Sequence, residues 1–169
     1  SHGLRGKQWP FEESVGIPLI VYDPIAKNSG ASLDDPVATE DLFPTLLGLA
    51  GLTPRNELPG TDLTDLIHGR CNRLPRDGVM LEFVAELRQG LPFYDWVWRG
   101  FRSKRYKYTV RGDNMGGTPW QFFDLVQDPG EVQNLIDDPK HRTKIAQHHR
   151  FLIDRMQETE DHFVLLPAF

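Results

Sequence analysis

The sequence has 169 residues, the size of one ordinary domain or of one domain with an appendage. Hydrophobic residues make up 39% and charged residues 25%, which are values of a globular chain and exclude a disordered or membrane-embedded class. The net charge of −5 argues against a general binder of the nucleic-acid backbone, and the single cysteine, Cys71, excludes a disulfide framework and a multi-cysteine zinc site.

The first half of the chain contains a predicted strand followed by a predicted helix. Residues 17–22 form an apolar run that is too short for a helix, so they predict a buried strand. Residues 41–50 keep the apolar spacing of a helix, and Asp41 is the predicted N-cap. Because a strand followed by a helix suits the edge of an α/β sheet, residues 1–77 are interpreted as the end of an α/β core.

The second half predicts a small α+β layer. Four strands are expected over residues 79–84, 96–102, 105–110 and 121–125. In the third strand, large apolar and aromatic residues alternate with Lys107, Thr109 and Arg111, which predicts one solvent-facing side. A final helix is predicted from Asp138-Pro139 onward, with an apolar stripe at helical spacing. Residues 78–169 are therefore interpreted as a four-stranded antiparallel sheet covered by a C-terminal helix.

Three features suggest chemistry, and each has a simpler interpretation. Cys71 lies between two arginines, which favours a reactive thiol, but the sequence places no base beside it. Residues 101–111 mix basic and aromatic side chains as a single-stranded nucleic-acid platform does, yet their alternation is better explained by a strand with a buried face. Four histidines gather near the C-terminus without metal-ligand spacing, and a solvated helix face is the expectation for them: His141, His148, His149 and His162.

Several longer motifs occur in order along nearly the whole chain. They are His2-Gly3-Leu4-x-Gly6-Lys7-x-x-x-Phe11-Glu12-Glu13-Ser14-Val15-x-Ile17-Pro18-Leu19-Ile20, Asp41-Leu42-x-Pro44-Thr45-Leu46-Leu47-x-Leu49-Ala50-Gly51, Arg105-Tyr106-Lys107-Tyr108 and Phe123-Asp124-Leu125-x-x-Asp128-Pro129-x-Glu131-x-x-Asn134-Leu135. Together they resemble the C-terminal part of the sulfatases of the alkaline-phosphatase-like superfamily. The resemblance implies the end of the α/β catalytic core followed by the family's small C-terminal subdomain.

The resemblance also implies a site and an activity. Lys7 matches the family lysine that contacts the sulfate group, and His2 matches a less constant residue of the same loop. A fixed ammonium suits this role because sulfuryl transfer places negative charge on the leaving oxygen. The formylglycine nucleophile and the ligands of a divalent cation, expected to be Ca²⁺, lie upstream of this chain in the family. The chain is therefore expected to be a fragment of a sulfuric ester hydrolase that is inactive alone.

Alternatives and partners remain open at this point. A phosphonate or phosphate ester hydrolase of the same superfamily would use the same lysine, and a non-catalytic interaction module is a second class. The expected partners are a sulfate-ester small molecule or saccharide and the N-terminal portion of the same enzyme, with no nucleic acid and no membrane. Self-association through residues 1–51 is a further expectation, residues 91–96 are a candidate substrate rim, and the sequence does not indicate a compartment.

Overall fold

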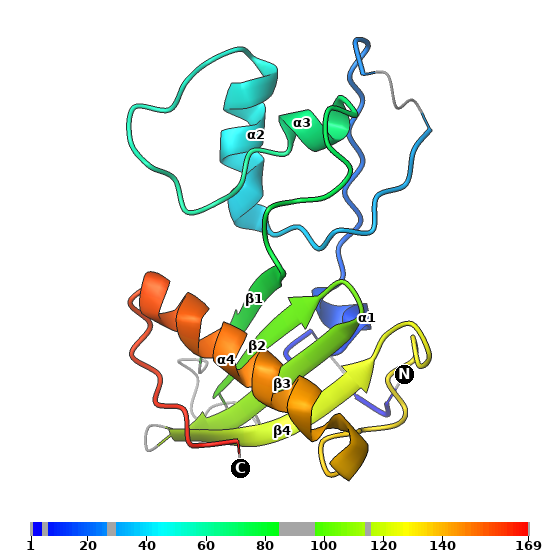
Figure 1. Cartoon of the computed structure of the whole chain (residues 1–169), viewed down its shortest axis with the longest axis vertical. Helices are drawn as coiled ribbons and strands as arrows, with labels where there is room; N and C mark the ends of the chain where they lie inside the picture. The colour runs from blue at the N-terminus through cyan, green and yellow to red at the C-terminus, as the bar shows by residue number, and fades with distance from the viewer. Residues whose placement is uncertain (1, 5–6, 27–29, 85–96, 114–115, 169) are drawn as a thin grey trace. The chain divides into compact units, whose positions relative to one another are not determined.

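The computed structural model describes all residues except 1, 5–6, 27–29, 85–96, 114–115 and 169 (Figure 1). The chain forms two compact units. One unit consists of Ser1–Ile17 together with Met80–Phe169, and the other is Pro18–Val79. The first seventeen residues thus pack with the C-terminal half, whereas the assignment of residues 1–77 and 78–169 to two parts of an enzyme stays a prediction. None of the described helices has the length and apolar character needed to cross a bilayer.

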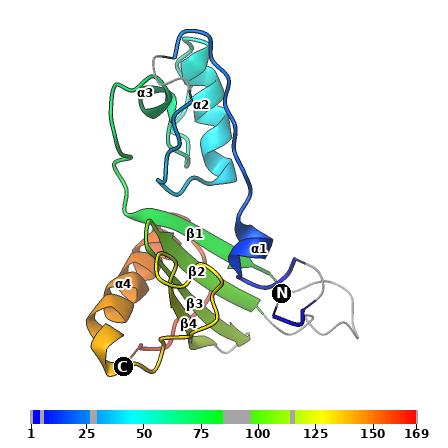
Figure 2. The same cartoon turned by 90° about the vertical axis from the view of Figure 1, so that its right-hand side faces the viewer.

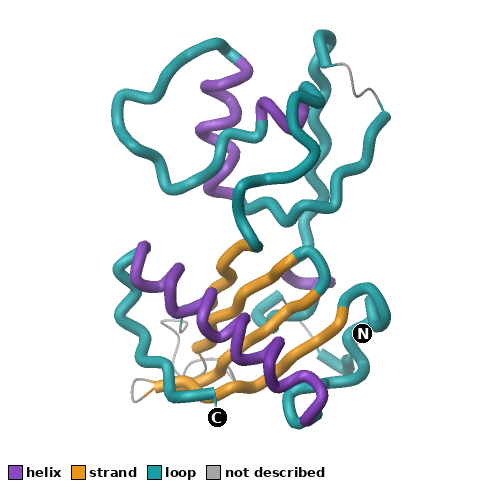
Figure 3. Tube along the Cα trace, in the orientation of Figure 1, coloured by secondary structure: helices purple, strands orange, loops and turns teal. Residues whose placement is uncertain are grey.

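The larger unit is built on a sheet with a helix across it. Within the described residues the sheet has four strands in the order β1-β2-β3-β4, and the β2–β3 and β3–β4 pairs are antiparallel. The helix α4, Arg142–Glu158, lies across one face (Figures 1 and 3). The predicted four-stranded sheet covered by a C-terminal helix is confirmed. The strands are β1 Gly78–Phe83, β2 Val97–Ser103, β3 Tyr106–Asp113 and β4 Gly116–Asp124.

The core of this unit lies between the sheet and α4. Alternate residues of β3 contribute Tyr108 and Val110, and helical spacing brings Ile145, Leu152 and Met156 of α4 against them. The expectation of a solvated helix face was wrong for two of the histidines. His148 and His149 are buried because they pack edge-on against aromatic rings of the sheet.

Burial of His149 makes the stability of this unit depend on pH. The Tyr108 hydroxyl lies 2.9 Å from Nδ1 of His149, and burial lowers the pKa of His149. A lowered pKa in the folded state means that the unfolded chain binds the proton more readily, so the free energy of unfolding rises with pH and levels off above the unfolded pKa of about 6.5. We expect stability to fall between about pH 7.5 and about pH 5, by at most about 1.4 kcal/mol per pH unit from this group.

Urea unfolding followed by tryptophan fluorescence measures this dependence. No tryptophan occurs in residues 18–79, the smaller unit, so tryptophan emission reports on the larger unit selectively. His149→Gln should flatten the pH dependence, while His162→Gln, at an exposed position, should leave it as in the wild type. Equal slopes for the wild type and His149→Gln would contradict the expectation.

The second face of the sheet is covered by the start of the chain. Figure 2 shows the short helix α1, Glu12–Val15, on the side of the sheet opposite α4. The predicted solvent-facing side of β3 was therefore wrong for two of its three residues. Lys107 and Thr109 are 0% exposed, and only Arg111 faces solvent. A local alternation pattern cannot show that a segment about a hundred residues earlier covers that face.

Strand β4 begins earlier than the sequence predicted. It includes Gly116, Gly117 and Pro119, which are typical of turns. Pro119 is tolerated because β4 is an edge strand, where the missing N–H costs no ladder bond. The C-terminal tail then pairs with this edge, because the Gly117 amide donates to the Val164 carbonyl at 2.8 Å and the Leu166 amide donates to the Gly117 carbonyl at 2.9 Å.

In its described residues, the smaller unit has two short α-helices around a minor core. They are α2, Leu42–Leu49, and α3, Thr64–Ile67, and the core consists of Leu63, Leu66 and Leu74. The predicted buried strand at residues 17–22 was wrong. No described segment pairs with these residues, and without a neighbouring ladder an extended segment has no sheet to join. The segment is instead exposed, with Ile20 at 91% and Tyr22 at 89%.

Asp41 stabilises the smaller unit in a way that differs from its predicted N-cap role. Its carboxylate makes no hydrogen bond to the first turn of α2. It accepts instead from both terminal nitrogens of Arg76, at 2.8 and 2.5 Å, and from the amides of Ala38 and Thr61. Burial by itself would raise the pKa of Asp41, but these hydrogen bonds outweigh it and hold the pKa below its ordinary value.

Candidate functional site

Lys7 projects from a segment whose backbone is fixed against the sheet. The indole N–H of Trp98, on β2, donates to the carbonyl of Gln8 at 2.8 Å. Pro10 is fully buried, and the ring of Phe11 lies 6.1 Å from the ring of Phe123. The Lys7 side chain is exposed, and within the described part of the chain no hydrogen bond or ion pair reaches its ammonium group. Among the described residues, Lys7 is thus an unpaired cation on an anchored loop.

His2, the second predicted site residue, lies on the same segment in an unusual backbone conformation. Its φ of 52° and the φ of 65° at Gly3 place both residues in the left-handed region. The imidazole stacks on the ring of Phe11, with centroids 3.8 Å apart and planes inclined by 13°. His2 is exposed, and its role at the sulfate site stays a prediction.

A buried ion network joins this segment to the sheet and to the turn after β4. Nζ of Lys107, on β3, lies 2.5 Å from Oε1 of Glu131 and 3.1 Å from Oε1 of Glu12. The amide of Glu12, the first residue of α1, donates to Oε2 of Glu131 at 2.6 Å. Arg102 reaches the second carboxylate oxygen of Glu12 at 3.5 Å. Both oxygens of Glu12 and Oε2 of Glu131 therefore face a donor, whereas Oε1 of Glu131 meets the Lys107 ammonium as an ion pair without hydrogen-bond geometry.

The backbone of Glu131 has a left-handed conformation, which residues other than glycine seldom adopt. Its φ is 53°, and its side chain is 2% exposed. The amides of Val132 and Gln133 donate to the carboxylate of Asp128, which closes the turn that carries Glu131. Burial raises the pKa of Glu131, and Lys107 opposes that rise. The ion pair with Lys107 is what makes a charged carboxylate tolerable at this depth.

The neighbouring motif residues support the same edge of the sheet. The guanidinium of Arg105 contacts both oxygens of Asp124 at 2.6–3.0 Å, and this contact lowers the pKa of Asp124. Asn134 accepts from the amide of Phe122 and donates to the carbonyl of Trp120. These contacts fix the turn after β4 against the strands, so Glu131 meets Lys107 at a defined position.

A separate group of hydrogen-bonded polar side chains, Asp23, His68 and Arg70, lies in the smaller unit. Nε2 of His68 is 2.6 Å from Asp23, and Nδ1 of His68 is 2.7 Å from a terminal nitrogen of Arg70. Because a guanidinium only donates, Nδ1 accepts and Nε2 carries the proton that is shared with Asp23. Both ring nitrogens of His68 are thus occupied, and the hydrogen bond from His68 lowers the pKa of Asp23. This arrangement ties residue 23 to the end of α3.

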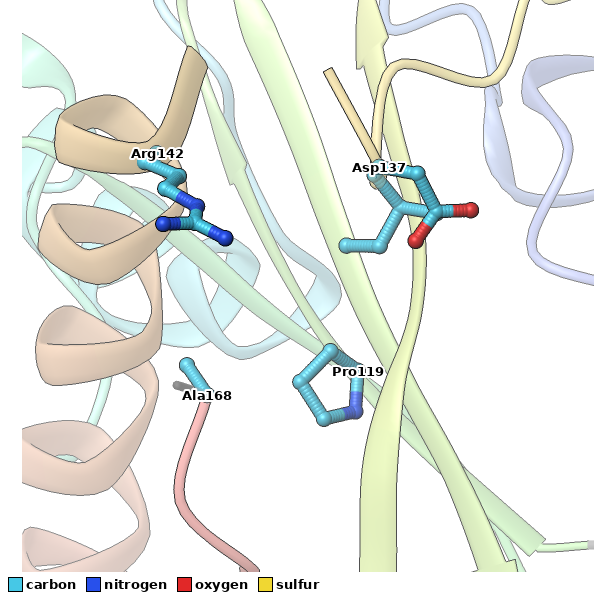
Figure 4. A pocket seen from close by; sticks show the side chains of 5 residues that line it. Pro119, Asp137, Arg142 and Ala168 are labelled. Atoms are coloured by element: carbon cyan, nitrogen blue, oxygen red, sulfur yellow. The ribbon is translucent and has the colours of Figure 1, made fainter. Parts of the chain in front are cut away.

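The remaining candidate features do not add to the site. Cys71 is exposed, and no group of three His, Cys, Asp or Glu residues converges to hold a metal ion in the part of the chain that the structure describes. Residues 91–96, the candidate substrate rim, lie outside the described residues. A hollow of about 340 Å³ is lined by Pro119, Ile136, Asp137, Arg142 and Ala168 (Figure 4). In that view the Asp137 carboxylate points away from Arg142, and the lining includes neither Lys7 nor His2.

Comparison with known proteins assigns the chain to a family. The family model described as N-sulphoglucosamine sulphohydrolase, C-terminal, matches residues 1–159. The chain belongs to the sulfatase family. It corresponds to the C-terminal part of such an enzyme, and its sulfatase structural neighbours confirm the expected alkaline-phosphatase-like fold.

Individual sulfatases and one related hydrolase show how far the similarity extends. An ulvan-active sulfatase of Formosa agariphila is 32% identical over 93% of this chain and 30% of its own length. The solved structure of a 2-O GAG sulfatase is 30% identical with a TM-score of 0.66, over 78% of this chain and 27% of its own. A phosphonate monoester hydrolase of Agrobacterium radiobacter is 26% identical with a TM-score of 0.52, over 70% of this chain and 24% of its own. The chain spans about a third of the length of the curated relatives it matches.

Sequence reasoning singled out Lys7 and His2 but missed the network beneath them. Glu12, Lys107 and Glu131 all lie within the motifs that carry the family resemblance, yet nothing in the sequence says that they meet. Glu12 lies 95 residues from Lys107 and 119 from Glu131. The available signal was chemical: a lysine in the middle of a strand whose neighbours are aromatic needs a carboxylate partner if it is buried.

Proposed function

We propose that this chain is the C-terminal part of a sulfatase that hydrolyses sulfate esters, and that Lys7 contacts the sulfate group. The match of residues 1–159 to the sulfatase C-terminal family carries the proposal. The exposed ammonium of Lys7, on a loop anchored by Trp98 and by the Glu12 network, supports it. A sulfate ester is an anion with three peripheral oxygens, and a lysine offers three donors and a full charge to it.

In the proposed reaction, Lys7 acts through charge rather than through proton exchange. When the sulfur–oxygen bond of the ester breaks, negative charge develops on the leaving oxygen, and an ammonium already in place stabilises it without reorganising. The same ammonium attracts the substrate anion before the reaction. The nucleophile, a formylglycine formed from cysteine or serine, would be supplied by the part of the enzyme that precedes this chain.

A divalent cation, proposed to be Ca²⁺, would be held by the same preceding part. The described residues of this chain do not fit a calcium site, because no three acidic or histidine side chains converge. We expect chelation with EDTA to abolish aryl-sulfate turnover by the longer protein and Ca²⁺ to restore it, with the helical content of the 169-residue chain unaffected. Turnover that survives exhaustive chelation would contradict the proposed cation.

The proposed substrate is a sulfated saccharide. The names of two similar proteins support this proposal. One is an ulvan-active sulfatase, and the other is a 2-O GAG sulfatase. The other proposed partner is the N-terminal portion of the same enzyme, which would cover the exposed apolar side chains of the smaller unit, among them Ile20, Phe43 and Leu46. Self-association of the chain alone through residues 1–51 would bury the same side chains.

A phosphonate or phosphate ester hydrolase is the second candidate, favoured by the similarity to the phosphonate monoester hydrolase. The sulfatase proposal has more support because two sulfatase structures, a putative sulfatase of Bacteroides thetaiotaomicron and the 2-O GAG sulfatase, exceed this hydrolase in both identity and TM-score. Purified longer protein should be assayed on an aryl sulfate and on aryl phosphonate and phosphodiester substrates at equal concentration. We expect the highest kcat/KM on the sulfate, whereas a higher value on a phosphorus ester would favour the second candidate. Absence of turnover on all of them would favour a non-catalytic interaction module.

A further inference from the structure

The position of the Lys7 ammonium has to come from the backbone around it. Its own side chain makes no contact that would orient it within the described residues. The backbone is held on the C-terminal side of Lys7 at two points, the Gln8 carbonyl and the Glu12 amide. Electrostatic stabilisation and substrate positioning depend steeply on geometry, and a misplacement of about 1 Å can cost on the order of 100-fold in rate.

The ion network that contains Glu12 has features that stability alone does not explain. Lys107 is 0% exposed, and a buried ion network can often be replaced by apolar side chains without loss of stability. Glu131 also adopts a φ of 53°, a conformation that costs energy and persists only where the surroundings impose it. The strained backbone and the buried charges meet where the Lys7 segment enters α1. Together they favour a role for the network in setting the geometry of that segment.

We propose that Glu12, Lys107 and Glu131 are positioning residues that set the location of the Lys7 ammonium, so that the C-terminal sheet acts as the rigid support of the sulfate contact. Lys107 fixes both carboxylates, Glu131 fixes the backbone amide of Glu12, and Glu12 fixes the start of α1. Trp98 provides the second support at Gln8, the residue next to Lys7. This inference rests on the proposed function of Lys7 and extends it to residues that never contact the substrate.

The chain offers a matched pair of variants for the test. Glu12→Gln removes the charge that Lys107 and Arg102 contact while leaving the amide that donates to Glu131. Glu13→Gln makes the same chemical change one residue away at an exposed position. In the longer enzyme, Glu12→Gln should lower kcat and kcat/KM for an aryl sulfate together, by roughly 10- to 100-fold, while Glu13→Gln should leave both unchanged.

A double-mutant cycle with Lys7→Ala separates positioning from general stabilisation. If Glu12 acts through Lys7, then Glu12→Gln should cause less than about a twofold further loss in the Lys7→Ala background. Trp98→Phe, which deletes the indole N–H that holds the Gln8 carbonyl, should show the same pattern. Thermal midpoints measured on all variants should not follow the order of the losses in kcat.

The outcomes are distinguishable. An equal loss of kcat from Glu12→Gln in the wild-type and Lys7→Ala backgrounds would mean that the network only stabilises the fold, and it would overturn the positioning role. An unchanged kcat in Glu12→Gln would overturn that role as well. An unchanged rate in Lys7→Ala itself would overturn the proposed function of Lys7 and not merely the role of the network.

Discussion

Replacing Lys7 by alanine in the longer enzyme should lower kcat for an aryl sulfate by about 100- to 1,000-fold, a loss of about 2.7–4 kcal/mol of transition-state stabilisation. This is the effect of removing one fixed electrostatic donor from a developing oxyanion. Because Lys7 is exposed and unpaired within the described residues, its removal should not disturb the fold. Steady-state kinetics with parallel circular dichroism provide the measurement.

Two controls make the Lys7 result specific. Lys144→Ala removes an exposed lysine from α4, on the opposite face of the sheet, and should leave kcat unchanged. Lys7→Arg keeps the charge but replaces a compact ammonium by a wider planar group, so it should restore only part of the rate. Unchanged kcat and KM in Lys7→Ala would contradict the proposal that Lys7 contacts the sulfate group.

Lys107→Met should be the most destabilising single substitution in the ion network. It leaves the Glu131 carboxylate buried without its partner at 2.5 Å, and breaking a buried pair in this way costs about 3–5 kcal/mol. Urea unfolding followed by tryptophan fluorescence measures the loss, since the sequence of the smaller unit contains no tryptophan.

A compensating variant distinguishes uncompensated charge from lost packing. Lys107→Met combined with Glu131→Gln should recover a large part of the stability, because the glutamine is neutral and its oxygen can still accept from the Glu12 amide. Lys144→Met, on the exposed face of α4, should have little effect. A double variant no more stable than Lys107→Met would mean that packing of the lysine stem accounts for the effect.

Local patterns were sufficient to predict most of the larger unit. The alternation at residues 106–110 and the apolar stripe of the last helix each record one buried face, and those faces meet in the structure. Histidines on the same helix were misjudged, because a polar side chain is placed by the partner it finds: Tyr108 for His149, and Ser103 and an aromatic cluster for His148. Such partners come from strands that are distant in sequence.

Non-local contacts explain the other differences. The burial of Lys107 depends on Glu12 and Glu131, which no local period connects to it. The apolar run at residues 17–22 predicted a buried strand, but within the described residues it has no strand to pair with and its side chains are exposed. Lys7 could be chosen from its motif, whereas the supports at Gln8 and Glu12 required the structure.

The most direct measurement compares the 169-residue chain with the longer protein, each purified in the same way. Mass in solution and turnover of an aryl sulfate are measured for both. We expect hydrolysis by the longer protein only. The chain alone should be inactive, because Lys7 would lack a nucleophile to assist, and it should self-associate through the exposed apolar side chains of residues 1–51. A stable monomer of these 169 residues that hydrolyses the sulfate ester would contradict the proposal that the chain supplies the sulfate contact to a site completed elsewhere.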